Sequence, residues 1–271
     1  MIEIRNPTNN EIEGLINFKK SFSDFLEKRF REFVKNNRDL VYIAFEENIV
    51  GFSHGYLWRE NIGAIREVRA IKKDIEISLV EKMEETFKKK NCKKVRVWID
   101  ENQEILKNYL MKNGYSITTE LLSFEKSDLD YPTKGNPDVT VKKFEEKYID
   151  ELIKIEETSF SPEWQTSKES FLNTPKNIKF DLAFYNKKVV GYLIVSAGER
   201  IGHYGKVAVS PDFRCMGIGS RLTYEAIKFF KEKNVRKIFL RTPKDDIPAQ
   251  NLYKKFGFKE VSKEYDLMKK V

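Results

Sequence analysis

The sequence predicts an α/β protein built from two similar domains in tandem. The chain has 271 residues, about twice the length of a domain of roughly 130 residues. Short alternating segments typical of strands alternate with amphipathic segments typical of helices. The order of these segments before residue 128 returns after residue 137. A single large α/β domain would show the same alternation, but it would not explain the internal repeat.

The two halves match element by element. Each begins with a short alternating strand and an amphipathic helix, at 2–18 and 139–155. Two strands around a polar turn follow in each half, at 42–58 and 182–198. Strands that alternate with helices in this way favour an α/β domain, present twice.

The clearest correspondence lies between residues 79–114 and 222–257, which align without a gap. Each segment predicts a helix, a strand, a second helix and a glycine turn, and each half then ends in a strand. Identical pairs include Leu79/Leu222, Phe87/Phe230, Asn91/Asn234, Lys94/Lys237, Asn108/Asn251 and Gly114/Gly257. The two glycines follow the last apolar helix position, which is a C-cap signal.

The segment between the halves has the composition of a linker. Residues 128–138 carry two prolines, a glycine and several polar residues, with little apolar patterning. We therefore expect a first domain at 1–127, a linker at 128–137 and a second domain at 138–271.

Composition favours a soluble cytoplasmic protein. The formal net charge is +8, but lysines are interleaved with glutamates, which is typical of solvated helix faces and not of a nucleic-acid surface. No apolar run approaches the roughly 18 residues of a membrane span, and the N-terminal residues lack the pattern of a signal peptide. Two cysteines and two histidines favour reduced thiols and no metal site. The sequence leaves the oligomeric state open.

The two halves differ at one turn. In the second half, Arg214-Cys215-Met216-Gly217-Ile218-Gly219 lies between a predicted strand and a predicted helix. The first half is four residues shorter here and carries Lys73-Asp74-Ile75-Glu76 in place of the arginine and glycines.

This turn is suited to an anion. The first turn of a helix has about four backbone N–H groups without a helical partner, and the helix dipole adds positive charge there. Glycines let a phosphate approach these N–H groups, and an arginine adds a fork of donors. A tight turn that only permits close packing is the alternative. Cys215 is expected to supply a backbone N–H and not a reactive thiol.

These residues resemble a known family. The stretch "VAVSPDFRCMGIGSRL" is similar to the acetyl-coenzyme A signature of the GNAT N-acetyltransferases, and "AQNLYKKFGF" at 249–258 is similar to their later A-x-x-L-Y-x-x-x-G-F segment. The resemblance covers 138–271, whereas 1–126 keep the order of elements but lose the signature. It implies a mixed sheet whose fourth and fifth strands separate to admit acetyl-CoA.

The resemblance also implies roles for individual residues. Tyr253 stands where the family places the general acid that protonates the departing thiolate. His203 stands where some members carry a glutamate that acts as general base. The expected cofactor contacts are Val207, Ala208 and Val209 on the strand, Arg214, Cys215, Met216, Gly217, Ile218, Gly219 and Ser220 in the turn, and Asp246 and Asn251 beyond it. Asp246 replaces an asparagine of the family pattern.

The sequence leaves more than one candidate for the general base. Imidazole can accept a proton near neutral pH, but His203 could also be an exposed strand-end residue. Other relatives use a glutamate at the position of Arg241, which cannot act as a base. Glu163 and Glu199 stay open as alternatives. The first half has Leu110 where Tyr253 stands, and its His54 is expected in a core or an interface.

We therefore expect an acetyl-CoA-dependent N-acetyltransferase whose second domain is active and whose acceptor is a small-molecule or peptide amine. A non-catalytic protein that binds or senses acyl-CoA is the alternative. A nucleic-acid binder is a third possibility, which salt-dependent DNA binding would reveal.

Overall fold

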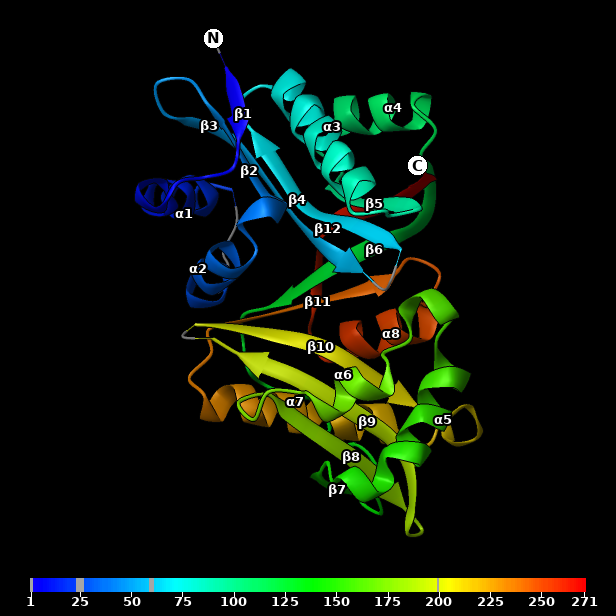
Figure 1. The fold of residues 1–271 in the computed structure, drawn as a ribbon. Helices are drawn as coiled ribbons and strands as arrows, with labels where there is room; N and C mark the ends of the chain where they lie inside the picture. The colour runs from blue at the N-terminus through cyan, green and yellow to red at the C-terminus, as the bar shows by residue number, and fades with distance from the viewer. Residues whose placement is uncertain (1, 23–26, 59–60, 199) are drawn as a thin grey trace. The chain divides into compact units, whose positions relative to one another are not determined.

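A computed structural model describes residues 2–22, 27–58, 61–198 and 200–271 (Figure 1). The chain forms two compact units, one of Met1–Leu122 with Ser262–Val271 and one of Ser123–Val261. We call them the first and the second unit. Each is an α/β structure with a mixed sheet, as the sequence predicts.

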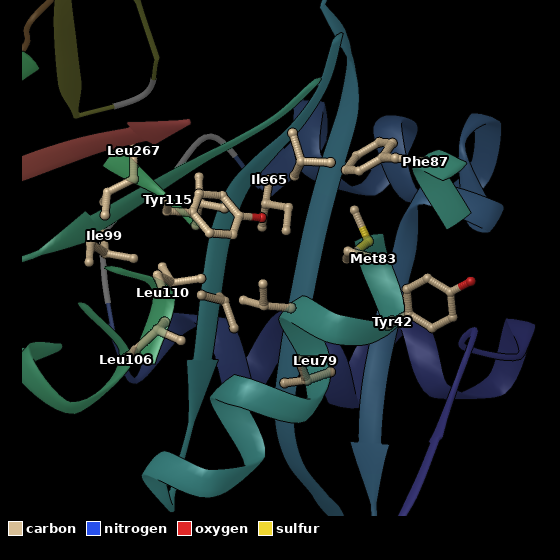
Figure 2. Close-up of a cluster of buried hydrophobic side chains, with 14 of the residues drawn as sticks. Tyr42, Ile65, Leu79, Met83, Phe87, Ile99, Leu106, Leu110, Tyr115 and Leu267 are labelled. Atoms are coloured by element: carbon tan, nitrogen blue, oxygen red, sulfur yellow. The ribbon is translucent and has the colours of Figure 1, made fainter. Parts of the chain in front are cut away.

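The first unit has the strand order β1-β2-β3-β4-β5-β12-β6. The pairs from β1 through β5 to β12 are antiparallel except β4–β5, which is parallel. Helix α3 packs against β3 and β4, and Figure 2 shows the apolar side chains buried there. The elements of this part of the chain are β1 (Glu3–Arg5), η1 (Asn9–Glu11), α1 (Ile12–Lys20), α2 (Glu27–Asn36), η2 (Arg38–Leu40), β2 (Val41–Phe45), β3 (Ile49–Trp58), β4 (Ile62–Ala70), α3 (Lys73–Lys89), β5 (Lys94–Asp100), α4 (Glu104–Lys112) and β6 (Ser116–Lys126).

The second unit has the strand order β6-β11-β10-β9-β8-β7, in which β10–β11 is parallel. Figure 1 shows α5 and α7 on opposite faces of β8, β9 and β10. The elements of this part of the chain are β7 (Thr140–Lys143), η3 (Glu146–Tyr148), α5 (Ile149–Ser159), η4 (Pro162–Trp164), α6 (Lys168–Leu172), β8 (Lys179–Tyr185), β9 (Lys188–Ala197), β10 (Ile201–Val209), η5 (Pro211–Phe213), α7 (Ile218–Glu232), β11 (Lys237–Pro243), α8 (Ile247–Lys255) and β12 (Lys259–Lys270).

Matched positions of the repeat adopt the same unusual backbone. Asn91 and Asn234, which follow α3 and α7, have φ of 59° and 54°. Gly114 and Gly257, which follow α4 and α8, have φ of 87° and 81°. All four lie in the left-handed region that glycine and asparagine tolerate best. The glycine turns predicted from the sequence therefore end equivalent helices in the two repeats.

The last strands do not follow the repeat boundaries. In β12, residues 264–270 pair antiparallel with β5, and Leu267 is buried in the core of the first unit (Figure 2). In β6, Phe124 is fully buried and lies 6.3 Å from the ring of Tyr253 in the second unit. The boundaries of the expected domains, 1–127 and 138–271, come from the repeat in the sequence. The boundaries of the compact units come from contacts in the folded chain, and the two sets differ. The two strands carry similar alternating patterns, so sequence alone does not tell which sheet each one completes.

A buried ion pair joins the first helix of each repeat to the middle of a strand, with its charges reversed between the repeats. In the first unit Lys19 of α1 pairs with Glu67 of β4, and in the second Glu156 of α5 pairs with Lys206 of β10. Glu156 is 1% exposed. Removing one member of such a pair leaves a charge in the protein interior without compensation, which is costly.

We expect Lys206→Met to lower the free energy of unfolding by about 3 kcal/mol, because Glu156 would lose its cation while staying buried. The control is Lys147→Met, which removes an exposed pair with Glu145 and should change stability by about 0.5 kcal/mol or less. Urea unfolding at neutral pH measures both. Equal, small changes in the two variants would contradict a structural role for the buried pair.

Candidate active site

The site begins where two parallel strands of the second unit separate. The register of β10 with β11 runs from Ile201 opposite Lys237 to His203 opposite Phe239 and ends there. On its other edge β10 stays paired with β9 as far as Val209 opposite Gly191. Residues 204–209 thus lie beyond the end of the pairing between β10 and β11, and on that side they form a strand edge. A strand edge offers backbone N–H and C=O groups to an extended ligand.

A β-bulge lies at the same point. The pairing of β10 with β9 shifts between Tyr204 and Lys206, so that Gly205 is the additional residue. The first unit has a matching shift in the pairing of β3 with β4. A bulge changes which face the following side chains occupy, and bulges are frequent next to active sites.

The bulge places His203 and Lys206 on one face of β10. A Cβ atom at Gly202 would meet the ring of Phe230 on α7, and the Tyr204 hydroxyl lies 3.0 Å from that of Thr223 on α7. His203 lies between these two residues in sequence, so its side chain points to the opposite face of the sheet, away from α7. The Lys206 side chain points to the same face as His203, because it pairs with Glu156 of α5.

Lys206 ties the segment after α5 to this face. Its ammonium donates to the Trp164 carbonyl at 2.7 Å and to the Thr166 hydroxyl at 3.0 Å, in addition to its pairing with Glu156. The ammonium also lies 4.0 Å from the centre of the Phe160 ring. This role of Lys206 could not be predicted from the sequence, because one lysine among many has no distinguishing pattern. Residues 160–166 are thereby held against β10 three residues beyond His203.

The predicted turn lies at the end of β10 and at the start of α7. Gly217 is the N-cap of α7, with φ of 74°, and Cys215 has φ of 61°. Arg214, Cys215, Met216 and Gly217 are exposed. The first-turn amides of Ile218, Gly219 and Ser220 have no acceptor within the helix. The turn therefore presents a group of exposed donors, as an anion site requires.

The structure places the strand and turn residues next to one another. The Arg214 side chain donates from Nε to the Val209 carbonyl at 3.3 Å, so the arginine lies at the end of the β10 edge. Val207 is partly exposed, and Ala208 is buried in the cluster that faces α5. Ile218 and Ser220 are buried beneath the turn. These residues supply backbone to the site and pack it from below.

Asp246 and Asn251 belong to α8. Asp246 is its N-cap, with one carboxylate oxygen accepting from the Ala249 N–H at 3.1 Å. A capping carboxylate is tied to its own helix, and this use of Asp246 was not foreseen. Asn251 lies on the exposed side of α8. Leu252, its neighbour, packs against Gly219 in the first turn of α7, where a Cβ would lie 3.2 Å from it.

Tyr253 is buried among aromatic rings. Its ring lies 5.6 Å from that of Tyr204, with an interplanar angle of 75°, and 5.9 Å from that of Phe258. Burial raises the pKa of the Tyr253 hydroxyl well above its ordinary value, and nearby Tyr204 and Asp246 raise it further. The hydroxyl is therefore protonated at neutral pH, and the raised pKa makes it a weaker acid than an exposed tyrosine.

Two other sequence candidates cannot be placed at this site. Glu199 lies outside the described residues, and the side chain of Glu163 does as well. Arg241 of β11 is exposed. Of the sequence candidates for a base, His203 is the one whose strand position the structure describes on the face of Lys206.

In the first unit, a buried glutamate, Glu76, lies in the first turn of the equivalent helix, α3. In the alignment of the repeats, Glu76 of α3 corresponds to Gly219 of α7. Glu76 is 1% exposed, and burial raises the pKa of its carboxyl group even though the Ala70 backbone and Gln103 donate to it. The first turn of α3 therefore carries a buried carboxyl group at the position where α7 has a glycine. His54, the other histidine, is buried against Phe30 and Phe33 and contacts Glu67.

The described part of the chain contains no helix long and apolar enough to span a membrane and no group of three or more His, Cys, Asp or Glu side chains that could hold a metal ion.

Comparison with known proteins agrees with this architecture. Residues 145–258 match the family model of the acetyltransferase (GNAT) family. The chain is 43% identical over 61 residues to an N-alpha-acetyltransferase of Sulfurisphaera tokodaii, an alignment that covers 22% of this chain and 36% of the relative.

Solved structures match the fold along the whole chain. A GCN5-related N-acetyltransferase from Sphaerobacter thermophilus has a TM-score of 0.80 at 14% identity, covering 99% of this chain and 95% of that one. A tandem GNAT protein from the clavulanic acid biosynthesis pathway has a TM-score of 0.76 at 9% identity, covering 100% and 98%. At such identities the likeness shows the fold alone.

The fold is thus that of tandem GNAT proteins. The match to the acetyltransferase (GNAT) family lies in the second repeat, and curated relatives that align with this chain are named N-acetyltransferases.

Proposed function

We propose that this protein transfers an acetyl group from acetyl-CoA to a primary amine at a single site in the second unit. The observation that carries the proposal is the exposed turn 214–219, which lies where β10 ends and α7 begins. The first unit keeps the fold but has a buried glutamate at the equivalent helix start. One unit therefore offers an anion site and the other does not.

The residues present fit acetyl-CoA. Gly217 is exposed and precedes the helix-start amides, which lack a helical acceptor. The exposed Arg214 adds a guanidinium, so a pyrophosphate would find both kinds of donor. The edge of β10 at 204–209 suits the amide-bearing pantetheine arm. When bound, the co-substrate supplies an activated acetyl thioester.

Two side chains supply the proton transfers in this proposal. His203 takes a proton from the ammonium of the acceptor, directly or through a water, and frees the amine to attack. Tyr253 gives its hydroxyl proton to the departing thiolate, a role that its protonated state at neutral pH permits. Positioned acids and bases of this kind each contribute about 100- to 10,000-fold.

The acceptor is a primary amine on a small molecule or a peptide. The segment 160–166, held by Lys206, lies on the same face of β10 as His203. It is therefore the part of the second unit that borders an amine approaching His203. The relative from Sulfurisphaera tokodaii is named an N-alpha-acetyltransferase, which makes peptide N-termini the first acceptors to test.

We expect Gly217→Glu to abolish acetyl-CoA binding, because it sets a carboxylate at the turn and forces a side chain into a left-handed backbone. Isothermal titration calorimetry of the wild type should find one site per chain. The control is Gly114→Glu, since Gly114 also has positive φ but nothing lies within 4 Å of its Cβ position. Two equivalent sites, or full affinity in Gly217→Glu, would contradict a single site at this turn.

We expect Tyr253→Phe to lower kcat by about 100-fold or more with little change in acetyl-CoA affinity, because it keeps the ring and removes only the proton donor. Tyr204→Phe is the matched control, since that neighbouring hydroxyl contacts Thr223. Single-turnover kinetics with a panel of amines measures both. A wild-type rate for Tyr253→Phe under chemistry-limited conditions would show that the acid is another group. Binding without turnover of any amine would support an acyl-CoA sensor.

We expect His203→Gln to lower the rate and to remove the acidic limb of the pH–rate profile. The acceptor amine titrates too, so the comparison with wild type carries the inference. His54→Gln, which changes the other histidine, should leave that limb in place. An unchanged acidic limb in His203→Gln would assign the base elsewhere, with Glu163, Glu199 and solvent next to be tested.

A further inference from the structure

The segment that joins the two repeats is docked along α7. Near the C-terminal end of that helix Asp130 lies 4.0 Å from Lys231. In its middle the Tyr131 ring packs edge-on against Tyr224, with 4.8 Å between ring centres. Residues 135 and 136 then reach the first turn of the same helix. A segment with the composition of a flexible linker therefore follows α7 back to the candidate cofactor turn.

Gly135 allows the chain to approach the helix closely. It has φ of 74°, and a Cβ atom there would lie 2.8 Å from the carbonyl carbon of Ser220 and still closer to the Arg221 nitrogen. Real side chains do not tolerate such contacts with backbone, so only glycine fits. Position 135 is thus a point of direct backbone contact between the segment and the first turn of α7.

Asn136 makes two hydrogen bonds to the cofactor turn. Its side-chain Nδ2 donates to the Met216 carbonyl at 2.8 Å, and its backbone N–H donates to the Gly217 carbonyl at 3.3 Å. The other end of the same amide, Oδ1, accepts from the Asp138 N–H at 2.8 Å. The side chain is therefore held at both ends, between its own loop and the turn.

Holding these two carbonyls orients two amides. In a planar trans peptide the C=O and N–H groups point in opposite directions. The Met216 carbonyl and the Gly217 N–H belong to one peptide group, and the Gly217 carbonyl and the Ile218 N–H belong to the next. The Gly217 carbonyl also accepts from the Arg221 N–H of α7 at 3.0 Å, so the helix itself helps to orient the second peptide. The bond from the Asn136 side chain to the Met216 carbonyl orients the first one, so that the Gly217 N–H points away from the joining segment.

We propose that Asn136 is a positioning residue that pre-orders the pyrophosphate turn of the second unit. The inference rests on the proposed function, because it assigns Asn136 to the same acetyl-CoA site. Without the side-chain bond, the peptide between Met216 and Gly217 is free to rotate, and part of the binding free energy is spent on ordering it. Asn136 does not touch the acetyl group or the acceptor in this proposal.

The test compares the binding of coenzyme A by calorimetry in wild type, Asn136→Ala and Asn136→Asp. The alanine variant removes the donor to Met216 without adding a charge, so it carries the inference. The aspartate variant keeps the oxygen that accepts from Asp138 and loses the donor, but it also sets a carboxylate beside the turn. We expect both variants to bind about tenfold more weakly, the scale of one hydrogen bond, with unchanged kcat at saturating acetyl-CoA. In the ligand-free protein, the amide resonances of Gly217 and Ile218 should broaden or shift in both variants.

Tyr131→Ala is the matched control, because it loosens the same segment at its contact with Tyr224 and leaves the turn bonds in place. It should bind coenzyme A as the wild type does. Wild-type affinity in Asn136→Ala, or an equal loss in Tyr131→Ala, would overturn the positioning role. Failure of the proposed function has a different signature, which is a wild-type protein that binds no coenzyme A or one in which Gly217→Glu binds normally.

Discussion

The separation of β10 from β11 after His203 is the constraint on which the second unit depends. Parallel strands that stayed paired would satisfy the backbone groups of 204–209 and leave no edge for a ligand. Separation leaves that edge beyond the reach of β11, and the bulge at Gly205 falls where it begins. On one face of β10, Thr223 and Phe230 of α7 pack against the strand. On the other face, Lys206 holds the segment after α5. The packing on both faces of β10 is therefore arranged around strands that part.

The repeat shows which features belong to the fold and which to the site. Left-handed residues after matched helices, the bulge and the buried ion pair occur in both units. The ion pair even tolerates exchange of its charges, Lys19–Glu67 against Glu156–Lys206, because Coulomb attraction between the two elements is indifferent to which one carries the cation. The helix start is different, since Glu76 is buried where the second unit has a glycine. The two units therefore share the fold and differ at the residues of the helix start.

Much of this could be predicted from the sequence, because repetition and periodicity are properties of the chain itself. The repeat, the glycine turns and the position of the 214–219 turn between a strand and a helix all follow from residue types and spacing. The exchange of the last strands could not be predicted, because β6 and β12 have similar patterns and only packing of Phe124 and Leu267 distinguishes their sheets. The roles of Lys206 and Asn136 arise from single hydrogen bonds between distant segments, and such bonds leave no periodic trace in a sequence.

The joining segment illustrates why composition alone is an incomplete guide to flexibility. Proline, glycine and polar residues predict a chain that forms no helix or strand, but they do not predict that it lacks contacts. Here the same residues permit an irregular path close to α7, since glycine at 135 admits backbone contact and asparagine at 136 bonds to a turn that has no regular partner. The backbone carbonyls of an irregular turn need hydrogen-bond donors from outside the turn. A segment that connects two repeats and must pass this helix is in a position to provide them, and in doing so it orients the opposite amides.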